Sequence, residues 1–358
     1  MTINVTKTYL PSIEEYIHYL EGIWARGQVT NHGPLVLELE QRLQEMLQVK
    51  HVILVANGTV ALQIAIKALE IKGAAITTPF SYVATTSSLV WEGCRVIFAD
   101  IEPDSLCISP QAIEAAITPD TRAIIATHVY GNPCDVENIA KIADEHGLNV
   151  IYDAAHAFGV RYQGRSLASF GDIATLSFHA TKLFHTVEGG ALVTGDDELA
   201  HRIRYMRNFG HNGQEAYWGL GINGKISELH AAMGLAVLKH VPELIASRRA
   251  VSEQYDKLLS ALPLKKPKLR AETDYNYGYY PVLLESEQAL LRVKKHLNSI
   301  EIFPRRYFYP SLNLLPYFDG ISCPISEDAS RKVLCVPLFP GQTNQEVEAV
   351  VAGIREAI

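Results

Sequence analysis

A lysine in apolar surroundings is the side chain of this 358-residue chain with the clearest potential for chemistry. Lys182 lies just beyond the strand-like run Ile173–Phe178, and the apolar Leu183 and Phe184 follow it. An amine in an apolar cleft has a lowered pKa and can attack an aldehyde as a nucleophile. Most lysines are solvated surface charges, so a catalytic assignment needs support from other groups.

Two further segments offer such groups. In ANGTVAL, Gly58 and Thr59 fall between an apolar strand and the start of a helix, where free backbone N–H groups and the helix dipole favour an anion such as phosphate. An ordinary turn with Thr59 as the helix cap is the alternative. Asp153 directly follows the apolar run VIY, so we expect it at the carboxyl end of a buried parallel strand, where ligands bind in open α/β sheets. A plain helix N-cap is the alternative for Asp153.

One cofactor would use all three features. Pyridoxal 5′-phosphate needs N–H donors for its phosphate, an amine that forms a Schiff base with its aldehyde, and an anion that keeps its ring nitrogen protonated. The sequence therefore predicts pyridoxal 5′-phosphate, with its pyridoxamine form, as the cofactor.

Strands and helices alternate around these segments. From about residue 50, β-branched runs such as HVILVA, CRVIFAD and LNVIYDAA alternate with helical patterns, as in βαβ units. We expect an α/β fold with a three-layer, doubly wound, mostly parallel sheet. A helix at Glu228–Leu238 precedes Pro242, which marks a break. We predict a large cofactor-binding domain over 1–240 and a smaller C-terminal α+β domain over 241–358.

Composition excludes several classes of protein. The 32 Lys and Arg residues against 39 Asp and Glu give a net charge of −7 with no basic block, which argues against nucleic-acid binding. The five cysteines have no CxxC spacing, so no metal or iron–sulfur cluster is expected. The start of the chain lacks a secretory layout, and no charge-free run could span a bilayer. We therefore expect a soluble, cytoplasmic protein without membrane contact.

On these motifs the chain resembles the nucleotide-sugar aminotransferases of the DegT type, a branch of the fold type I pyridoxal-phosphate superfamily. The resemblance covers almost the whole length, from TYLPSIEEYIHYLEGIW through NGTVAL, PFSYVAT, YDAAHAFG, SFHATK and GINGKISELHAAMGL to YPSLNLLPYF and LCVPLFPG. The motifs NGTxAL, DAAHA and SFHxxK in this order are specific.

The resemblance assigns cofactor contacts to individual residues. It implies that Lys182 binds the cofactor covalently and later moves a proton between the substrate carbon and the cofactor carbon, while Asp153 pairs with the pyridine nitrogen. The other implied contacts are Gly58, Thr59 and Ser177 at the phosphate, His156 near the ring hydroxyl, Tyr82 (with Phe80 as the weaker choice) stacked on the ring, and Asn223, which reaches the phosphate of the neighbouring subunit. A homodimer with shared active sites follows.

The resemblance also implies contacts to substrate. These are Glu188 near the lysine, and Arg305, Arg306 and Tyr309 at the nucleotide diphosphate. We expect His185 to make a polar contact either to the substrate or to a loop. Adjacent arginines can equally be solvated, and the tyrosines at 277, 279, 280 and 307 are interpreted as packing residues. Two positions depart from the family pattern: Val187 stands where Gly is frequent, and Lys225 where Arg is usual, which puts loop flexibility and any bidentate anion contact in doubt.

The expected reaction is transfer of an amino group from glutamate to the keto carbon of a nucleotide-linked deoxysugar, in O-antigen, other surface-polysaccharide or antibiotic sugar synthesis. TTPFSYVATTSSLVWEG and HVYGNPCDVE resemble enzymes that use dTDP-4-keto-6-deoxyglucose, which would give dTDP-4-amino-4,6-dideoxyglucose. The alternatives are a 3-keto sugar nucleotide aminotransferase, a pyridoxamine-phosphate-dependent sugar dehydratase and a non-catalytic sensor on the same fold. Lys182 speaks against the dehydratase, which has histidine there, and Lys182 with Asp153 speaks against the sensor.

Overall fold

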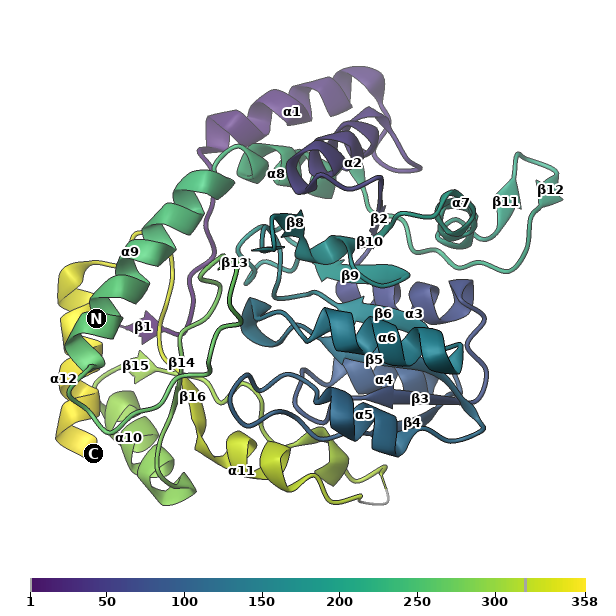
Figure 1. The fold of residues 1–358 in the computed structure, drawn as a ribbon. Helices are drawn as coiled ribbons and strands as arrows, with labels where there is room; N and C mark the ends of the chain where they lie inside the picture. The colour runs from purple at the N-terminus through teal and green to yellow at the C-terminus, as the bar shows by residue number, and fades with distance from the viewer. Residues whose placement is uncertain (1, 319–320) are drawn as a thin grey trace.

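A seven-stranded sheet forms the centre of the computed structural model, which describes residues 2–318 and 321–358 (Figure 1). All neighbouring strands pair in parallel except β10, which is antiparallel to both of its neighbours. The strands in spatial order are β2 (His51–Val55), β10 (Gly190–Thr194), β9 (Ile173–Ser177), β6 (Asn149–Asp153), β5 (Thr121–Thr127), β3 (Ala74–Thr77) and β4 (Arg95–Phe98). The prediction of a mostly parallel sheet is confirmed, although β9 ends one residue earlier than expected.

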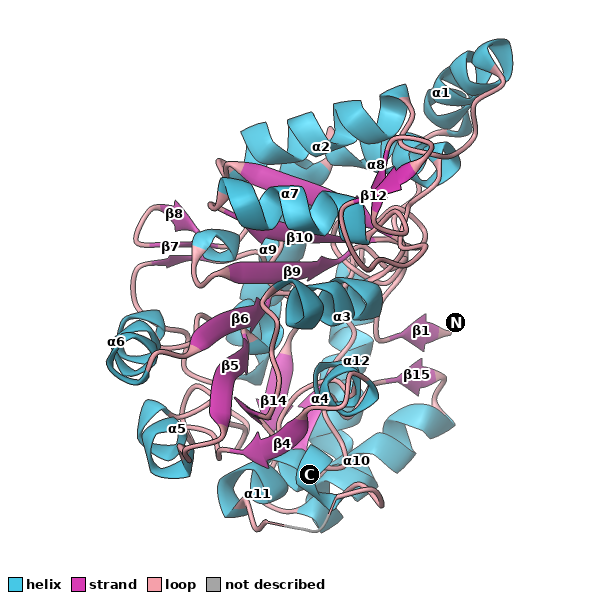
Figure 2. Cartoon of the chain, turned by 90° about the vertical axis from the view of Figure 1, so that its right-hand side faces the viewer, coloured by secondary structure: helices cyan, strands magenta, loops and turns pink. Residues whose placement is uncertain are grey.

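Helices cover both faces of this sheet (Figures 1 and 2), which confirms the three-layer α/β fold. One layer consists of α3 (Gly58–Ala68), α4 (Ala84–Trp91) and α7 (Asp197–Met206), and the other of α2 (Pro34–Leu47), α5 (Pro110–Ala116), α6 (Val136–His146) and α8 (Glu228–Leu238). Alternate residues of a strand face opposite layers. In β2, Val52 and Leu54 join one core, and Ile53 and Val55 the other.

Side-chain caps explain where many helices begin. A polar side chain accepts a hydrogen bond from the backbone N–H three residues further on and so satisfies one of the free donors of the first turn. The capping residues of this kind are Ser12, Asn57, Ser109, Asp135, Asp196, Ser227, Ser286 and Thr343.

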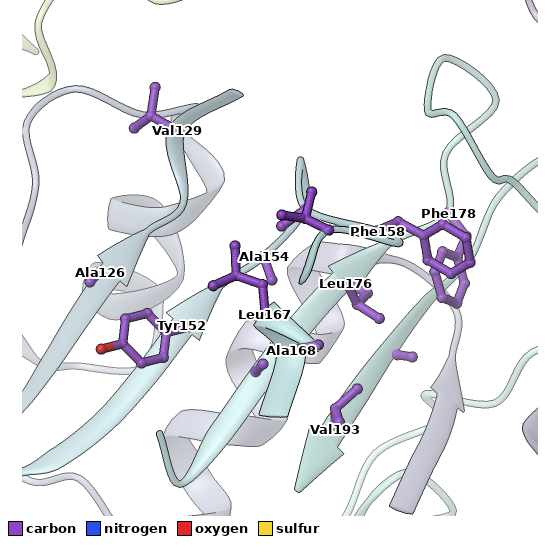
Figure 3. Close-up of a cluster of buried hydrophobic side chains, with 14 of the residues drawn as sticks. Ala126, Val129, Tyr152, Ala154, Phe158, Leu167, Ala168, Leu176, Phe178 and Val193 are labelled. Carbon is purple, nitrogen blue, oxygen red and sulfur yellow. The ribbon is translucent and has the colours of Figure 1, made fainter. Parts of the chain in front are cut away.

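Aromatic and aliphatic side chains share the core beneath the lysine loop. Tyr152, Leu176 and Val193 come from three neighbouring strands and share one cluster with Phe158 and Phe178 (Figure 3). The Phe158 and Phe178 ring centroids lie 5.8 Å apart at nearly a right angle, a favourable edge-to-face arrangement. This core therefore fixes the end of β9, from which the loop to Lys182 departs.

A second core lies in the C-terminal part of the chain. It is built by α9 (Val241–Leu259), α10 (Glu287–Ser299), α12 (Asn344–Ala357) and the antiparallel pair β14 (Pro281–Leu283) and β16 (Val333–Cys335), with α11 (Pro324–Lys332) beside it. Pro242 lies in the first turn of α9 rather than at the break, because a first-turn residue needs no N–H. The domain boundary after residue 240 stays a prediction.

The N-terminal helix α1 (Ile13–Arg26) packs beside α8, and α8 packs against α2 (Figure 1). The short elements are β1 (Ile3–Asn4) paired with β15 (Ile302–Phe303); β7 (Arg161–Tyr162) between β8 (Arg165–Ser166) and β13 (Thr273–Asp274); the pair β11 (His211–Asn212) and β12 (Ala216–Tyr217), which projects from the body of the molecule; and 3-10 turns at Val129–Gly131, Leu167–Ser169 and Leu312–Leu314. Among the described residues, no helix is both long and apolar enough to cross a membrane.

Candidate active site

The sheet topology brings the three chemically distinctive segments to one edge. Strands β2, β6 and β9 run in the same direction, because β2 and β9 are both antiparallel to β10 and β6 is parallel to β9. The Gly58 turn follows β2 and the Lys182 loop follows β9, and Asp153 is the last residue of β6. This edge is where open α/β sheets bind their ligands.

The turn after β2 has the features of an anion site. Asn57 caps α3, and its side chain accepts from the N–H of Val60 at 2.9 Å, so the alternative of Thr59 as the cap is wrong. The first N–H groups of a helix have no acceptor within it, which leaves those of Gly58 and Thr59 to bind an anion. A β-carbon on Gly58 would lie 3.1 Å from Cβ of Ser177, so the absence of a side chain lets the two segments approach.

Asp153 is a buried carboxylate with specific partners. Its side chain is 5% exposed and accepts hydrogen bonds from the Thr85 hydroxyl at 2.7 Å and the Ala155 N–H at 3.1 Å. Burial raises the pKa of Asp153, and the two hydrogen bonds and the positive charge of Lys182 act in the opposite direction. No helix begins within residues 154–160, so the helix N-cap considered from the sequence is wrong. The carboxylate instead accepts from Ala155 in a local turn and, through its other oxygen, from Thr85 of α4.

A chain of hydroxyl groups continues from Asp153 into the protein. Thr85 contacts the Ser81 hydroxyl at 2.8 Å, and Ser81 accepts from Thr127 at 3.0 Å. All of these side chains are buried. Hydrogen bonds that follow one another polarise each other, so the chain favours the charged form of Asp153.

Lys182 lies in the loop between β9 and β10. Its Nζ donates a hydrogen bond to the hydroxyl of Tyr279 at 3.2 Å. Burial lowers the pKa of Lys182, and the negative charge of Asp153 raises it. The amine is therefore more easily deprotonated than an exposed lysine and lies within electrostatic reach of the carboxylate.

Aromatic side chains surround the amine. The His156 ring stacks on Phe308 with centroids 5.4 Å apart and meets the Tyr279 ring edge-on at 4.8 Å. Its Nδ1 accepts from the N–H of Tyr130 at 3.2 Å, and burial lowers its pKa well below the usual range, so His156 is neutral. Tyr82 is 59% exposed, which leaves its ring accessible to a flat ligand.

The other residues expected near the lysine differ in exposure and in whether their polar atoms already have partners. Asn223 is exposed and accepts from the Lys225 amine at 2.7 Å. Glu188 is also exposed, and its carboxylate lies 3.7 Å from His179. His185 is fully buried, with Nε2 at 2.7 Å from the Tyr9 carbonyl and Nδ1 accepting from the Val187 N–H, so backbone groups occupy both ring nitrogens.

The two adjacent arginines have different surroundings. Arg306 forms an ion pair with Glu287 at 2.6 Å, and its guanidinium lies 3.4 Å from the ring centroid of Tyr309. Arg305 is exposed, and its guanidinium lies 5.8 Å from the Tyr307 ring centroid. Arg305 is therefore the freer of the two cations.

Sequence reasoning missed two residues of this site. Thr85 belongs to PFSYVAT, and its position three residues after Tyr82 at the start of a helix could have singled it out. Tyr279 was interpreted as packing, and no local pattern distinguishes it from its tyrosine neighbours. No group of three or more His, Cys, Asp and Glu side chains within 2–318 and 321–358 has the arrangement of a metal site.

Comparison with known proteins gives matches over the full length. The family model described as the DegT/DnrJ/EryC1/StrS aminotransferase family matches residues 12–355. The dTDP-4-amino-4,6-dideoxy-D-glucose transaminase of Shigella dysenteriae is 43% identical over 364 residues, covering 99% of this chain and 98% of the relative. The protein of the same name from Escherichia coli is 39% identical over 363 residues, covering 97% and 96%.

A solved structure is also closely similar. DesI, crystallised in the presence of its TDP-sugar product, superimposes with a TM-score of 0.93 at 32% sequence identity, covering 99% of this chain and 92% of DesI. The similarity therefore includes the sheet, the helical layers and the C-terminal part together.

Proposed function

The chain belongs to the DegT/DnrJ/EryC1/StrS aminotransferase family, and on this premise we propose that it aminates the 4-keto carbon of a dTDP-linked 6-deoxysugar. It is a pyridoxal-phosphate-dependent sugar aminotransferase. The substrate is dTDP-4-keto-6-deoxyglucose, the product is dTDP-4-amino-4,6-dideoxyglucose, and glutamate is the amino donor. The observation that carries the substrate assignment is the 43% identity, over 99% of the chain, to a transaminase named for that amino sugar.

The side chains at the sheet edge fit the cofactor. The N–H groups of Gly58 and Thr59, with the Ser177 hydroxyl, would bind the phosphate, because Gly58 leaves room for Ser177 at close range. Asp153 would pair with the ring nitrogen. When bound, pyridoxal phosphate supplies an aldehyde for amino groups and a ring that accepts electrons.

Lys182 would have two tasks. It would bind the cofactor through its amine, and once released it would act as the base and acid that moves a proton at the substrate carbon. Its lowered pKa suits both, since the neutral amine is the nucleophile and the base. The neutral His156 and the accessible ring of Tyr82 would border the ring of the cofactor.

The substrate would lie on the exposed side of the lysine. Glu188, with its exposed carboxylate, and Arg305, with its exposed guanidinium, are suited to contact the sugar and the diphosphate. The proposed contacts of Arg306 and Tyr309 would reach the substrate together, because the guanidinium lies on the tyrosine ring. His185 would act through the loop backbone that it holds.

The proposal includes a homodimer with shared active sites. The segment from Phe209 to Ile222, which contains the projecting β11–β12 pair, leads directly to Asn223. It exposes several large apolar side chains, namely Phe209, Tyr217, Trp218, Leu220 and Ile222. Exposed apolar surface of this kind is typical of a subunit interface, and it would carry Asn223 to the partner's phosphate site.

Mixing two inactive variants tests the shared site. Lys182→Ala and Asn223→Ala would each be inactive or weak alone. In a mixed dimer, the wild-type Lys182 of one chain and the wild-type Asn223 of the other would complete one site. Random mixing should then restore about a quarter of wild-type activity, whereas a site built from one chain would gain nothing.

A direct assay tests the function. The purified enzyme is incubated with glutamate and a panel of 3-keto and 4-keto sugar nucleotides, and amino sugars are detected by mass. Product from dTDP-4-keto-6-deoxyglucose and not from the 3-keto compounds is the expected result. Preference for a 3-keto sugar would contradict the proposal and support a 3-keto sugar aminotransferase. Loss of the 3-hydroxyl without amination would contradict it and support a dehydratase. The cytoplasmic location and the role in polysaccharide synthesis stay predictions.

A further inference from the structure

Tyr279 contacts the amine of Lys182 although the two residues are 97 positions apart in sequence. The Lys182 Nζ donates to the phenol oxygen at 3.2 Å and lies 5.9 Å from the centroid of the same ring. We infer that Tyr279 is a further catalytic residue, whose hydroxyl receives the lysine amine when it is free of the cofactor and holds it for proton transfer. The inference rests on the proposed role of Lys182.

The backbone beside Tyr279 is fixed from two directions. Asn276 is buried, donates to the carbonyls of His156 and Phe158 at 3.0 and 2.9 Å, and accepts from the N–H of Gly278 at 3.0 Å. These bonds connect the tyrosine segment to the residues that follow Asp153. The phenol therefore has a defined position relative to the sheet edge.

Arg248 holds the same segment from the other side. It is 3% exposed and donates to the carbonyls of Gly278 at 3.2 Å and Leu338 at 3.1 Å. No carboxylate within 2–318 and 321–358 forms an ion pair with it. Burying a cation whose partners are backbone carbonyls costs folding free energy. Here the hydrogen bond from Arg248 fixes Gly278, the residue before Tyr279.

The charges around the amine are consistent with this role. Asp153, Tyr307 and Tyr82 raise the pKa of Lys182, and burial lowers it. Burial also raises the pKa of Tyr279 far above neutrality, and Arg248 opposes that rise. The phenol thus keeps its proton and offers a lone pair to the amine. This interaction holds the amine in place and favours its protonated form, in which Lys182 acts as the acid of the proton transfer.

Packing alone does not require the hydroxyl. The Tyr279 ring also meets Tyr130 at 5.6 Å and Tyr307 at 5.8 Å between centroids, contacts that phenylalanine would keep. Tyr279→Phe therefore removes the bond to Lys182 and leaves the ring.

The first measurement uses the enzyme with its cofactor in the pyridoxamine form, in which Lys182 is free. Labelling of Lys182 by an amine reagent is followed by peptide mass at a series of pH values. In Tyr279→Phe we expect the lysine pKa to fall by about one unit, because a hydrogen bond to a charged group is lost.

The second measurement separates chemistry from binding. Tyr279→Phe should lower kcat about tenfold while the KM for the sugar nucleotide is kept. The isotope effect with glutamate deuterated at its α-carbon should rise, because proton transfer becomes slower relative to other steps.

Tyr255→Phe is the matched control. Tyr255 is also buried, in the second core, where its hydroxyl donates to the Pro337 carbonyl and accepts from the Gln342 amide, both at 2.9 Å. The Tyr255→Phe variant should leave the pKa of Lys182, kcat and the isotope effect unchanged. An unchanged lysine pKa and kcat in folded Tyr279→Phe would overturn the inference, whereas a wild-type enzyme that forms no amino sugar would overturn the proposed function instead.

Discussion

The hydroxyl of Thr85 donates to a carboxylate oxygen of Asp153 across 2.7 Å, and both side chains are almost fully buried. Burial favours the neutral acid, while this hydrogen bond favours the anion. The charge of Asp153, at the end of a sheet strand, therefore depends on a threonine of helix α4, which is supported in turn by Ser81.

Thr85→Val tests this dependence. Valine keeps the shape and removes the donor, so the pKa of Asp153 should rise further. Activity that needs the anion is lost as pH falls through that pKa, and the acid limb of the kcat profile should move to higher pH, with kcat at neutral pH about tenfold lower. Thr86→Val is the control, because the Thr86 hydroxyl donates to the Val83 carbonyl and not to Asp153. Matching profiles for the two variants would contradict the prediction.

Lys182→Ala should abolish turnover while the protein stays folded. Loss of a positioned acid and base alone costs about a hundredfold to ten-thousandfold, and loss of the covalent attachment adds to it. Borohydride reduction of the wild-type enzyme followed by peptide mapping should find the cofactor on Lys182. A label on another lysine would refute the assignment.

Because of the buried His128, the free energy of unfolding should fall in mild acid. The ring is buried against Tyr152 with centroids 4.5 Å apart, and burial lowers its pKa from 6.5 to about 3. Because the unfolded chain binds the proton at higher pH, stability is full above pH 6.5 and is lost as pH falls toward the folded-state pKa. Between pH 6.5 and 5 the loss is about 2 kcal/mol.

His128→Gln removes this titration. Its amide oxygen can replace Nδ1 as the acceptor for the Cys134 N–H, which lies at 3.1 Å. Urea unfolding over the same pH range should give a flatter curve than for the wild type. Parallel curves would mean that other groups cause the acid sensitivity.

Glu228→Ala should destabilise the fold strongly. The buried carboxylate accepts from the N–H groups of Leu35 at 3.0 Å and Val36 at 2.9 Å, so it caps α2 from another helix. A β-carbon on Gly33 would lie 2.6 Å from this carboxyl group. Truncation leaves two buried donors unsatisfied and should cost about 3 kcal/mol in urea unfolding.

Glu38→Ala is the matched control and lies on α2, the helix that Glu228 caps. Its ion pair with Arg42 is exposed, and the loss should stay within about 0.5 kcal/mol. Equal losses of unfolding free energy for the two variants would show that the cap stabilises the fold no more than an exposed ion pair does.

Local and periodic features of the sequence predicted most of the fold. The helix Glu228–Leu238 has the bounds expected from pattern. Strand–helix alternation predicted the parallel sheet, and the rule that ligands bind at carboxyl ends of strands placed Asp153 and the Gly58 turn at one edge. These inferences depend only on residues that are close in sequence, whose types and spacing can be read directly.

Contacts between distant segments could not be predicted in this way. The bond from Lys182 to Tyr279 depends on how the C-terminal segment packs over the sheet, and one tyrosine among 17 carries no mark of it. The engagement of both His185 nitrogens with backbone likewise depends on the N-terminal segment at Tyr9.

The one reversed strand limits how the site can be altered. Gly190, the first residue of β10, pairs with Val55 on one side and Ser177 on the other, where each neighbour ends. A β-carbon there would lie 2.6 Å from the Asn57 backbone. The loop with Lys182 is thus anchored at both ends, so loops exchanged between related enzymes should need equal length and a terminal glycine, whatever their sequence.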